Sequence, residues 1–298
     1  MTTFTAVTYN VLAQSFAHRD RYPLSCPEAL DPTRRHALLL ARIDELRADL
    51  LCLQELEPAI YDDLRARLLT THHAAYVQRR QRPDGAAVFA RRSLFGWLGH
   101  DELHFQTQRS GDHNLALVVQ LTIDDQPLHV ACTHLAWQPE STPRAEHVGY
   151  HQMRELVTHR DAVAPTATWI FAGDFNATSQ SIVLAPALER GMEESCRSQR
   201  PWDTSAVNGR PRKLDYLLFS AGRLQPRPAT LPRLSRDTAL PSLTEPSDHL
   251  PLRVDFSPAP PRPHPAVVDD DDRHHGGRRL DPAGSPRGGT PESRQGQR

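Results

Sequence analysis

Six short segments of this chain place a polar or charged residue at or near the end of an apolar run, and this repeated pattern constrains the fold most. Short runs of aliphatic residues are typical of buried strands. A packed sheet presents the residues at its strand ends along one rim, where distant segments can meet. The polar residues are Asn10, Glu55, His134, Asp174 with Asn176, Asp215, and Asp248 with His249. The pattern predicts a packed sheet with a rim of acid, amide and histidine side chains.

Predicted strands and helices alternate along the chain. Strands are expected at 4–11, 49–54, 74–78, 85–90, 115–123, 128–133, 168–171, 214–219 and 250–256, and helices at 31–48, 58–69, 144–162 and 179–188. The first helix is predicted to align Leu39, Leu40, Ile43, Leu46 and Leu50 on one stripe. Strands interleaved with helices, with a central run of hairpins, indicate two sheets packed face to face with helices outside.

The composition changes near Ser257. From there to Arg298 the chain contains eight Pro, six Gly, a run of four Asp at 269–272 and no aromatic residue. Such a segment cannot bury enough apolar surface to offset the entropy lost on ordering. We therefore predict one folded domain over residues 1–256 and a disordered tail over residues 257–298.

Charge, cysteine spacing and hydropathy exclude several classes of protein. The formal net charge of −1 provides no global basic field of the kind that nonspecific nucleic-acid binders often carry. The four cysteines show neither close pairs nor zinc spacing, which favours a reducing compartment. No signal peptide is visible, and no run approaches the roughly 18–20 apolar residues that span a bilayer. We expect a soluble, cytoplasmic monomer without a membrane segment.

Arginine dominates the basic residues: 34 of the 35 are Arg, and Lys213 is the single lysine. Arginine suits bidentate contacts with phosphate, although a GC-rich genome would give the same bias. Arginines between residues 79 and 92 could hold a substrate backbone, and Trp137, Trp202 and Phe16 could stack on a base. Solvated surface and ordinary packing are the simpler interpretations of these residues.

Glu55 directly follows the apolar run DLLCLQ. A carboxylate at the mouth of a buried strand is costly unless a cation or a donor satisfies it. The alternative is a structural role before the helix that is predicted to begin at Pro58, because acids are favoured at helix N-termini. Together with the other oxygen-bearing side chains, and without cysteine among them, Glu55 favours a hard cation such as Mg²⁺ or Mn²⁺.

The string GDFN follows the predicted strand WIFA and contains Asp174 and Asn176. In an extended segment, residues two apart point the same way, so both side chains can face one phosphate or metal. The alternative is an Asx-type turn that closes a loop between a strand and a helix.

The string SDHLPL contains Asp248 and His249 just before the final predicted strand. A neutral histidine is a natural general base near pH 7, and a carboxylate on its other ring nitrogen can orient it. Asp215, inside KLDYLLF, is the candidate for that carboxylate. A histidine–aspartate pair at a strand start can also be purely structural.

Three further residues have predicted roles. Asn10, after TAVTY, could orient a ligating carboxylate or bind phosphate, unless it merely forms a turn. His134, in CTHLAW, could donate to a phosphate oxygen and stabilise the charge that grows in the transition state, unless it is a satisfied core histidine. Asn114 could reach the substrate, although it could equally be an ordinary loop residue.

In this order the motifs resemble the endonuclease/exonuclease/phosphatase superfamily, the DNase I-like fold, over residues 4–256. TYNVLAQ, ADLLCLQELE, THLAWQP and PSDHLPL are similar to the branch that holds carbon catabolite repressor-type deadenylases, nocturnin, Angel proteins and 2′-phosphodiesterase. The resemblance implies a four-layer α/β sandwich of two packed, mostly antiparallel sheets flanked by helices. It also implies dependence on Mg²⁺ or Mn²⁺ and cleavage of phosphoester bonds, often as a 3′–5′ exonuclease on RNA.

The resemblance also implies roles for individual residues. Glu55 would be the principal metal ligand with Asn10 beside it, and Asp248 would lie near the metal. Asp174, also a candidate ligand, would orient the attacking water together with Asn176. His134 would contact the phosphate, and Asp215 would pair with His249. Position 12 is Leu where apurinic-site endonucleases carry an acid, which argues against that branch.

Three hypotheses about function follow. The first is a Mg²⁺-dependent phosphodiesterase or 3′–5′ exonuclease that acts on RNA or short oligonucleotides. The second is a phosphatase or phosphodiesterase acting on a small molecule, such as a nucleotide, a dinucleotide or a lipid head group. The third is a binding module that has kept the fold without catalysis, which is disfavoured because no metal or base residue is missing.

Overall fold

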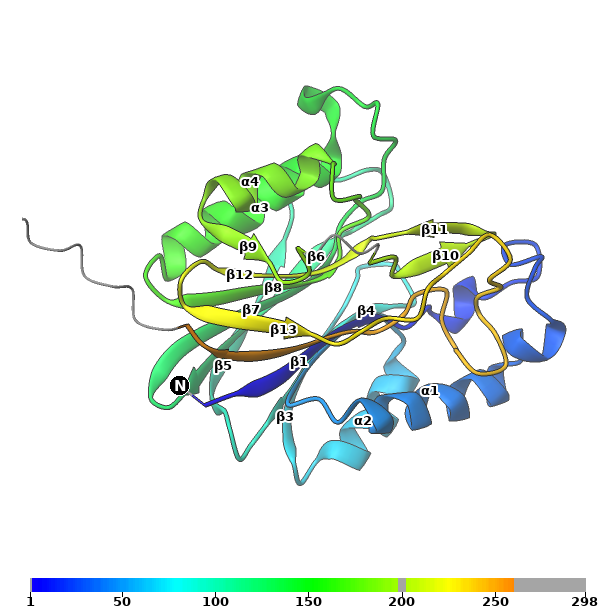
Figure 1. The fold of residues 1–298 in the computed structure, drawn as a ribbon, viewed down its shortest axis with the longest axis horizontal. Coiled ribbons are helices and arrows are strands. Elements are labelled where there is room, and N and C mark those ends of the chain that lie inside the picture. The colour runs from blue at the N-terminus through cyan, green and yellow to red at the C-terminus, as the bar shows by residue number, and fades with distance from the viewer. Residues whose placement is uncertain (1, 198–201, 260–298) are drawn as a thin grey trace, which may run out of the picture. The chain divides into compact units, whose positions relative to one another are not determined.

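Two six-stranded sheets form the centre of the computed structural model, which describes residues 2–197 and 202–259 (Figure 1). The first sheet has the order β13 (Leu224–Pro228), β14 (Leu252–Pro258), β1 (Phe4–Asn10), β2 (Leu50–Leu56), β4 (Gly85–Arg91) and β3 (His72–Gln78). The second has the order β5 (Gly96–His104), β6 (Leu115–Ile123), β7 (Gln126–His134), β8 (Thr168–Asp174), β12 (Asp215–Ser220) and β9 (Met192–Glu194). A small hairpin joins β10 (Ser205–Val207) to β11 (Arg210–Arg212).

Helices cover the outer faces of both sheets. Helices α1 (Pro32–Leu46) and α2 (Pro58–Leu68) pack on the first sheet, and α3 (Val148–Val163) and α4 (Ala185–Glu189) pack on the second (Figure 1). Asp31 caps α1 by accepting a hydrogen bond from the backbone N–H of Arg34 at 2.8 Å, as its position before Pro32 favours. The predicted four-layer α/β sandwich is therefore confirmed.

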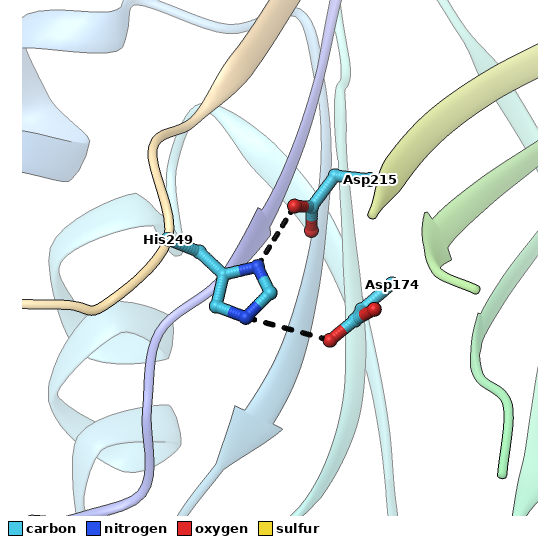
Figure 2. A group of neighbouring side chains, drawn as sticks. All are labelled: Asp174, Asp215 and His249. Atoms are coloured by element: carbon cyan, nitrogen blue, oxygen red, sulfur yellow. Dashed lines mark hydrogen bonds and ion pairs between the residues drawn. The ribbon is translucent and has the colours of Figure 1, made fainter. Parts of the chain in front are cut away.

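Each sheet contains one parallel strand pair among antiparallel neighbours. β1 runs parallel to β2, and β7 runs parallel to β8. Because the carboxyl ends of parallel strands meet at one edge of a sheet, residue 10 lies beside residue 54, and His134 lies beside Asp174. The antiparallel strand β12 begins at the same edge, where Asp215 pairs with Asp174 in register. Figure 2 shows Asp174, Asp215 and His249 converging there.

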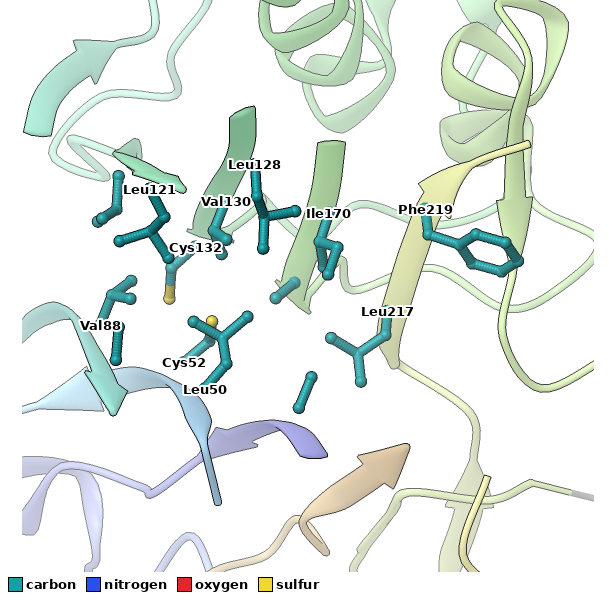
Figure 3. Close-up of a cluster of buried hydrophobic side chains, with 14 of the residues drawn as sticks. Leu50, Cys52, Val88, Leu121, Leu128, Val130, Cys132, Ile170, Leu217 and Phe219 are labelled. Atoms are coloured by element: carbon teal, nitrogen blue, oxygen red, sulfur yellow. The ribbon is translucent and has the colours of Figure 1, made fainter. Parts of the chain in front are cut away.

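The apolar core between the sheets holds this edge in place. Leu50 and Cys52 of β2 face Val130 and Cys132 of β7, and these four residues are fully buried (Figure 3). The opposite faces of the sheets bury a separate cluster under each helical layer. Since both faces of β2 and β8 are covered, the sequences of these two strands are nearly continuous apolar runs.

Several predicted elements require correction. Leu50 belongs to β2 and not to the stripe of the first helix, because α1 ends at Leu46 with Arg47 in a left-handed conformation at φ 45°. The helix expected over 179–188 is a 3₁₀ turn at 182–184 followed by the short α4. Strand β5 was not predicted, and β14 continues two residues past the predicted domain end at 256. The predicted tail from residue 260 onward lies outside the described residues.

Candidate active site

A cleft of about 630 Å³ opens at the edge where the central strands end. Seven of the predicted site residues line it: Glu55, Asn114, His134, Asp174, Asn176, Asp248 and His249. Asn10 and Asp215 lie behind this lining and are almost completely buried. The structure thus brings together the acid, amide and histidine residues that six distant segments of sequence supply.

Asn10 joins the two halves of the site. Its side-chain amide donates hydrogen bonds of 3.1 Å to Oε1 of Glu55 and to Oδ2 of Asp174, which come from different sheets. Its side-chain oxygen Oδ1 accepts a 3.0 Å hydrogen bond from the backbone N–H of Leu12, which fixes the orientation of the amide. Asn10 therefore places its nitrogen, rather than its oxygen, between the two carboxylates.

Glu55 reaches the cleft through an irregularity in β2. The pairing of β2 with β4 shifts register between Leu53 and Leu56, and Glu55 adopts a left-handed conformation with φ 54°. A non-glycine residue in this region costs roughly 1–2 kcal/mol, and such residues concentrate at functional sites. The backbone N–H of Ala13 donates to Oε2 of Glu55 at 3.3 Å, which holds the carboxylate toward the end of β1.

His249 lies between two buried carboxylates. Its Nδ1 is 2.8 Å from Oδ2 of Asp215, and its Nε2 is 3.6 Å from Oδ2 of Asp174 (Figure 2). Because a carboxylate can only accept, Nδ1 carries the hydrogen, and Nε2 faces the cleft. Burial opposes protonation of His249, but the charges of Asp215, Asp174 and Asp248 outweigh it and raise its pKa well above the ordinary value.

Burial lowers the pKa of the His134 imidazole despite the nearby charge of Asp174, which favours its neutral form. The side-chain amide of Asn176 donates to Nε2 of His134 at 2.8 Å and to the carbonyl of Leu135 at 2.9 Å. The hydrogen of His134 therefore resides on Nδ1, which lies 3.7 Å from Oε1 of Glu55. Nδ1 is buried without a hydrogen-bond partner among the described residues, so it can donate to a ligand.

Asp248 is held by residues far away in the sequence. The hydroxyl of Tyr22 donates to its Oδ2 at 2.9 Å, and both residues are buried. The preceding residue, Ser247, donates its hydroxyl to the carbonyl of Asn10 at 2.7 Å. These contacts connect the segment that carries His249 to the end of β1. The sequence patterns did not point to a role for Tyr22, because a loop tyrosine carries no periodic signal.

Arg35 of α1 binds the backbone of two loops at the site, the loop that follows β1 and the loop that precedes Asp248. Its guanidinium donates to the carbonyls of Leu12 at 2.7 Å, Val11 at 3.2 Å and Pro246 at 2.9 Å, and to Oε1 of Gln14 at 2.6 Å. The side chain is almost completely buried, at 3% exposure. A buried guanidinium with this many acceptors fixes the backbone on both sides of the site. Sequence reasoning missed this role.

Asn114 lies in the wall of the cleft. Its amide donates to the carbonyl of His134 at 2.7 Å, and its buried Oδ1 has no hydrogen-bond partner within the described part of the chain.

Arg79, also in the wall, donates from Nη2 to both oxygens of Asp84, at 2.7 and 2.5 Å. Its charge is therefore largely compensated.

The residues fit a hard divalent cation. Glu55, Asp174, Asp215 and Asp248 are four buried carboxylates, and burial raises the pKa of Asp174 although both imidazoles counteract it. A cation would offset this concentrated negative charge, and oxygen donors suit Mg²⁺. Asp174, Asp215 and His249 also offer atoms within 4.8 Å of one another. Since Asp215 already accepts from His249, the side of the site at Glu55 and Asp174 is the better position for an ion.

Comparison with known proteins identifies the family of the chain and several relatives. The model of the Endonuclease/Exonuclease/phosphatase family matches residues 7–249. The chain is 26% identical to 2′,5′-phosphodiesterase 12 of Mus musculus, over 84% of this chain and 51% of that protein. It is 27% identical to Nocturnin of Xenopus laevis, over 86% of this chain and 72% of that protein. The chain thus spans about half the length of the phosphodiesterase that it matches.

Solved structures share the fold. ANGEL2, described as a 2′,3′-cyclic phosphatase and bound to adenosine-2′,3′-vanadate, superposes with a TM-score of 0.72 at 23% identity, covering 85% of this chain and 95% of that one. The human Nocturnin catalytic domain with a bound sulfate gives a TM-score of 0.69 at 21% identity, covering 86% of this chain and 94% of that one.

Within the described residues, no helix is both long and apolar enough to cross a bilayer.

Proposed function

The chain belongs to the Endonuclease/Exonuclease/phosphatase family, and we propose that it hydrolyses phosphodiester bonds of short oligoribonucleotides with Mg²⁺ as its cofactor. One observation carries the proposal: Asp174 lies within 3.6 Å of Nε2 of His249 and within 3.5 Å of Nε2 of His134, while Asn10 ties it to Glu55. A base, a phosphate ligand and a set of oxygen donors therefore share one cleft.

The metal would be held by Glu55 and Asp174, with Asp248 near it. Asn10 would orient the two carboxylates. When bound, Mg²⁺ neutralises phosphate charge and makes nearby water more acidic. The oxygen donors suit Mg²⁺ and Mn²⁺ alike, so Mn²⁺ is the alternative cofactor.

The protein's own residues supply the remaining chemistry. His249, held in one tautomer by Asp215, takes a proton from the attacking water at Nε2. Asp174 and Asn176 orient that water and the reacting phosphate. His134 donates from Nδ1 to a non-bridging oxygen, where negative charge grows in the transition state. Asn114, in the wall of the cleft, would contact the substrate.

A substrate panel tests the proposal. The purified chain is incubated, with Mg²⁺ or with EDTA, with 3′,5′-linked and 2′,5′-linked oligoadenylates, a 2′,3′-cyclic mononucleotide, a dinucleotide and a lipid head-group phosphodiester. The relatives' names motivate the choice of linkages. We expect EDTA-sensitive release of mononucleotides from oligoadenylate. Release of phosphate from small molecules alone would favour the second hypothesis, and no turnover would contradict both.

A further inference from the structure

Trp137 is an exposed aromatic residue in the wall of the catalytic cleft. It is 48% exposed and is the single aromatic among the exposed large apolar side chains of the described residues. The two other candidates for base stacking are placed differently. Trp202 lines a separate pocket. Phe16 lines the same cleft, but the guanidinium groups of Arg82 and Arg21 already lie against its ring, at 5.2 and 5.9 Å from the ring centre. Trp137 therefore offers the accessible ring face beside the reacting groups.

The backbone around Trp137 is fixed on both sides. The N–H of Ala136 donates to Oε1 of Gln152 at 2.9 Å, and Arg109 donates from Nη1 to the carbonyl of Trp137 at 3.0 Å. Oε1 of Gln138 accepts from the N–H of Val148 at 2.5 Å. Such an anchored segment holds the backbone of Trp137 in place, so little backbone freedom is lost when a flat ligand binds to its ring.

Arginines are concentrated in the same cleft. Six arginines and four carboxylates line it, although the whole chain has a net charge of −1. The six arginines are Arg21, Arg79, Arg82, Arg109, Arg210 and Arg212. They come from four separate segments of the chain, and Asp84 compensates the charge of Arg79 alone among them through a two-oxygen hydrogen-bonded pair. The remaining five exceed the one or two arginines that bind a single phosphate in bidentate geometry. The ligand should therefore carry more than one phosphate.

Arg82 is placed to contact such an additional phosphate. Its buried Nε has no hydrogen-bond partner among the described residues, and its guanidinium is supported by the ring of Phe16. Arg80, two residues earlier in the same hairpin, is exposed and does not line the cleft. Arg82 in the cleft and Arg80 on the surface therefore form a matched pair of test and control positions.

We propose that the cleft binds an oligonucleotide through a base stacked on Trp137 and a second phosphate held by Arg82, next to the phosphate that is hydrolysed. The inference rests on the proposed function, because it takes the scissile phosphate to lie at His249 and Asp174. A lipid head group or a single phosphate has no base for Trp137. A mononucleotide has no second phosphodiester for Arg82.

Binding without turnover tests the inference. The affinity of the full chain for 5′-fluorescein-labelled octaadenylate is measured by anisotropy in EDTA over a range of salt concentrations. Trp137→Ala should weaken binding roughly tenfold or more without changing the salt dependence, because stacking is uncharged. Trp137→Phe should retain most of the affinity, and Trp97→Ala, a change outside the cleft, should have no effect.

The arginine pair provides the complementary result. Arg82→Gln should reduce the slope of log affinity against log salt by about 0.7, the value for one phosphate contact on a single strand. Arg80→Gln should leave that slope unchanged. Arg82→Gln should weaken the binding of inorganic polyphosphate, which is added as a competitor. Trp137→Ala should not weaken it, because polyphosphate has no base.

Each outcome has a definite meaning. Equal octaadenylate affinity for wild type and Trp137→Ala would overturn the stacking site, and equal salt slopes for Arg82→Gln and Arg80→Gln would overturn the phosphate contact. A pyrophosphate-linked dinucleotide that binds more tightly than octaadenylate would replace the oligonucleotide as ligand. Binding as expected without hydrolysis in the substrate panel would reject the proposed function alone.

Discussion

Asp215 accepts a 2.8 Å hydrogen bond from Nδ1 of His249, and this carboxylate is completely buried. Its Oδ1 has no hydrogen-bond partner in the part of the chain that the structure describes. The buried charge of Asp215 is thus compensated mainly through the imidazole. This pairing sets the tautomer of His249 and contributes to the rise in its pKa.

Replacing Asp215 should change both the rate and its pH dependence. A general base works only when unprotonated, so activity should rise as the pH increases through the pKa of His249, which the neighbouring carboxylates raise well above its ordinary value. Asp215→Asn removes a negative charge that raises this pKa, so the rising limb should move to lower pH. The maximal rate should fall about 10²- to 10⁴-fold, because the tautomer is no longer enforced. Rates between pH 5 and 9 provide the measurement, and an unshifted limb would contradict the pairing.

Removing the proposed metal ligand should uncouple stability from Mg²⁺. In the wild type, Mg²⁺ should raise the melting temperature in proportion to ln(1 + [Mg²⁺]/Kd), because the folded state alone presents the site. Glu55→Gln should abolish this shift, and without metal the variant should be at least as stable as the wild type, since one of four clustered carboxylates is gone. Calorimetry with and without Mg²⁺ tests both points. A full Mg²⁺ shift in the variant would remove Glu55 from the metal site.

Arg35 should act on the site through the two loops that it clamps. Arg35→Lys keeps the charge but cannot reproduce the forked hydrogen bonds to the carbonyls of Leu12 and Pro246. We expect a loss of about 2–4 kcal/mol in the free energy of unfolding. We also expect a lower kcat at saturating substrate. Urea unfolding and steady-state kinetics measure these effects, with the exposed Arg34→Lys as control, and an unchanged kcat would limit Arg35 to a stabilising role.

Gly173 should be intolerant of a side chain. It precedes Asp174 with φ 154°, and a Cβ there would lie 1.8 Å from the carbonyl oxygen of Thr133 in the neighbouring strand β7. Gly173→Ala should therefore separate β7 from β8 and cost several kcal/mol of stability. Gly99 is the matched control, because its φ is 159° and its Cβ would meet nothing within 4 Å. Thermal unfolding of Gly173→Ala and Gly99→Ala separates the effect of the clash from the effect of backbone geometry. Equal losses of stability in the two variants would show that the clash does not cause the loss.

The central strands and their polar ends could be predicted from the sequence for a physical reason. Strands buried on both faces, such as β2 and β8, must be continuous apolar runs, and a polar residue at their end is then conspicuous. Strand β5 escaped prediction because it is an edge strand with a mostly exposed sequence, GWLGHDELH, that contains two glycines.

The supporting contacts of the site could not be predicted in the same way. The bond from Tyr22 to Asp248 joins residues 226 positions apart, and Arg35 binds mainly backbone carbonyls, which any sequence provides. The left-handed conformation of Glu55 depends on a register shift against β4 and leaves no mark in the local sequence. Such features arise from tertiary packing, so they become visible only in the structure.

The proposed function requires His249 and the carboxylates around it to hydrolyse phosphodiester bonds. The most direct measurement is the Mg²⁺-dependent release of nucleotides from a 3′-labelled oligoribonucleotide by wild type, His249→Gln and His100→Gln, where His100 is an exposed histidine of β5. We predict that His249→Gln loses at least about 10²-fold in rate while remaining folded, and that His100→Gln matches the wild type. Equal rates for His249→Gln and wild type would contradict the account.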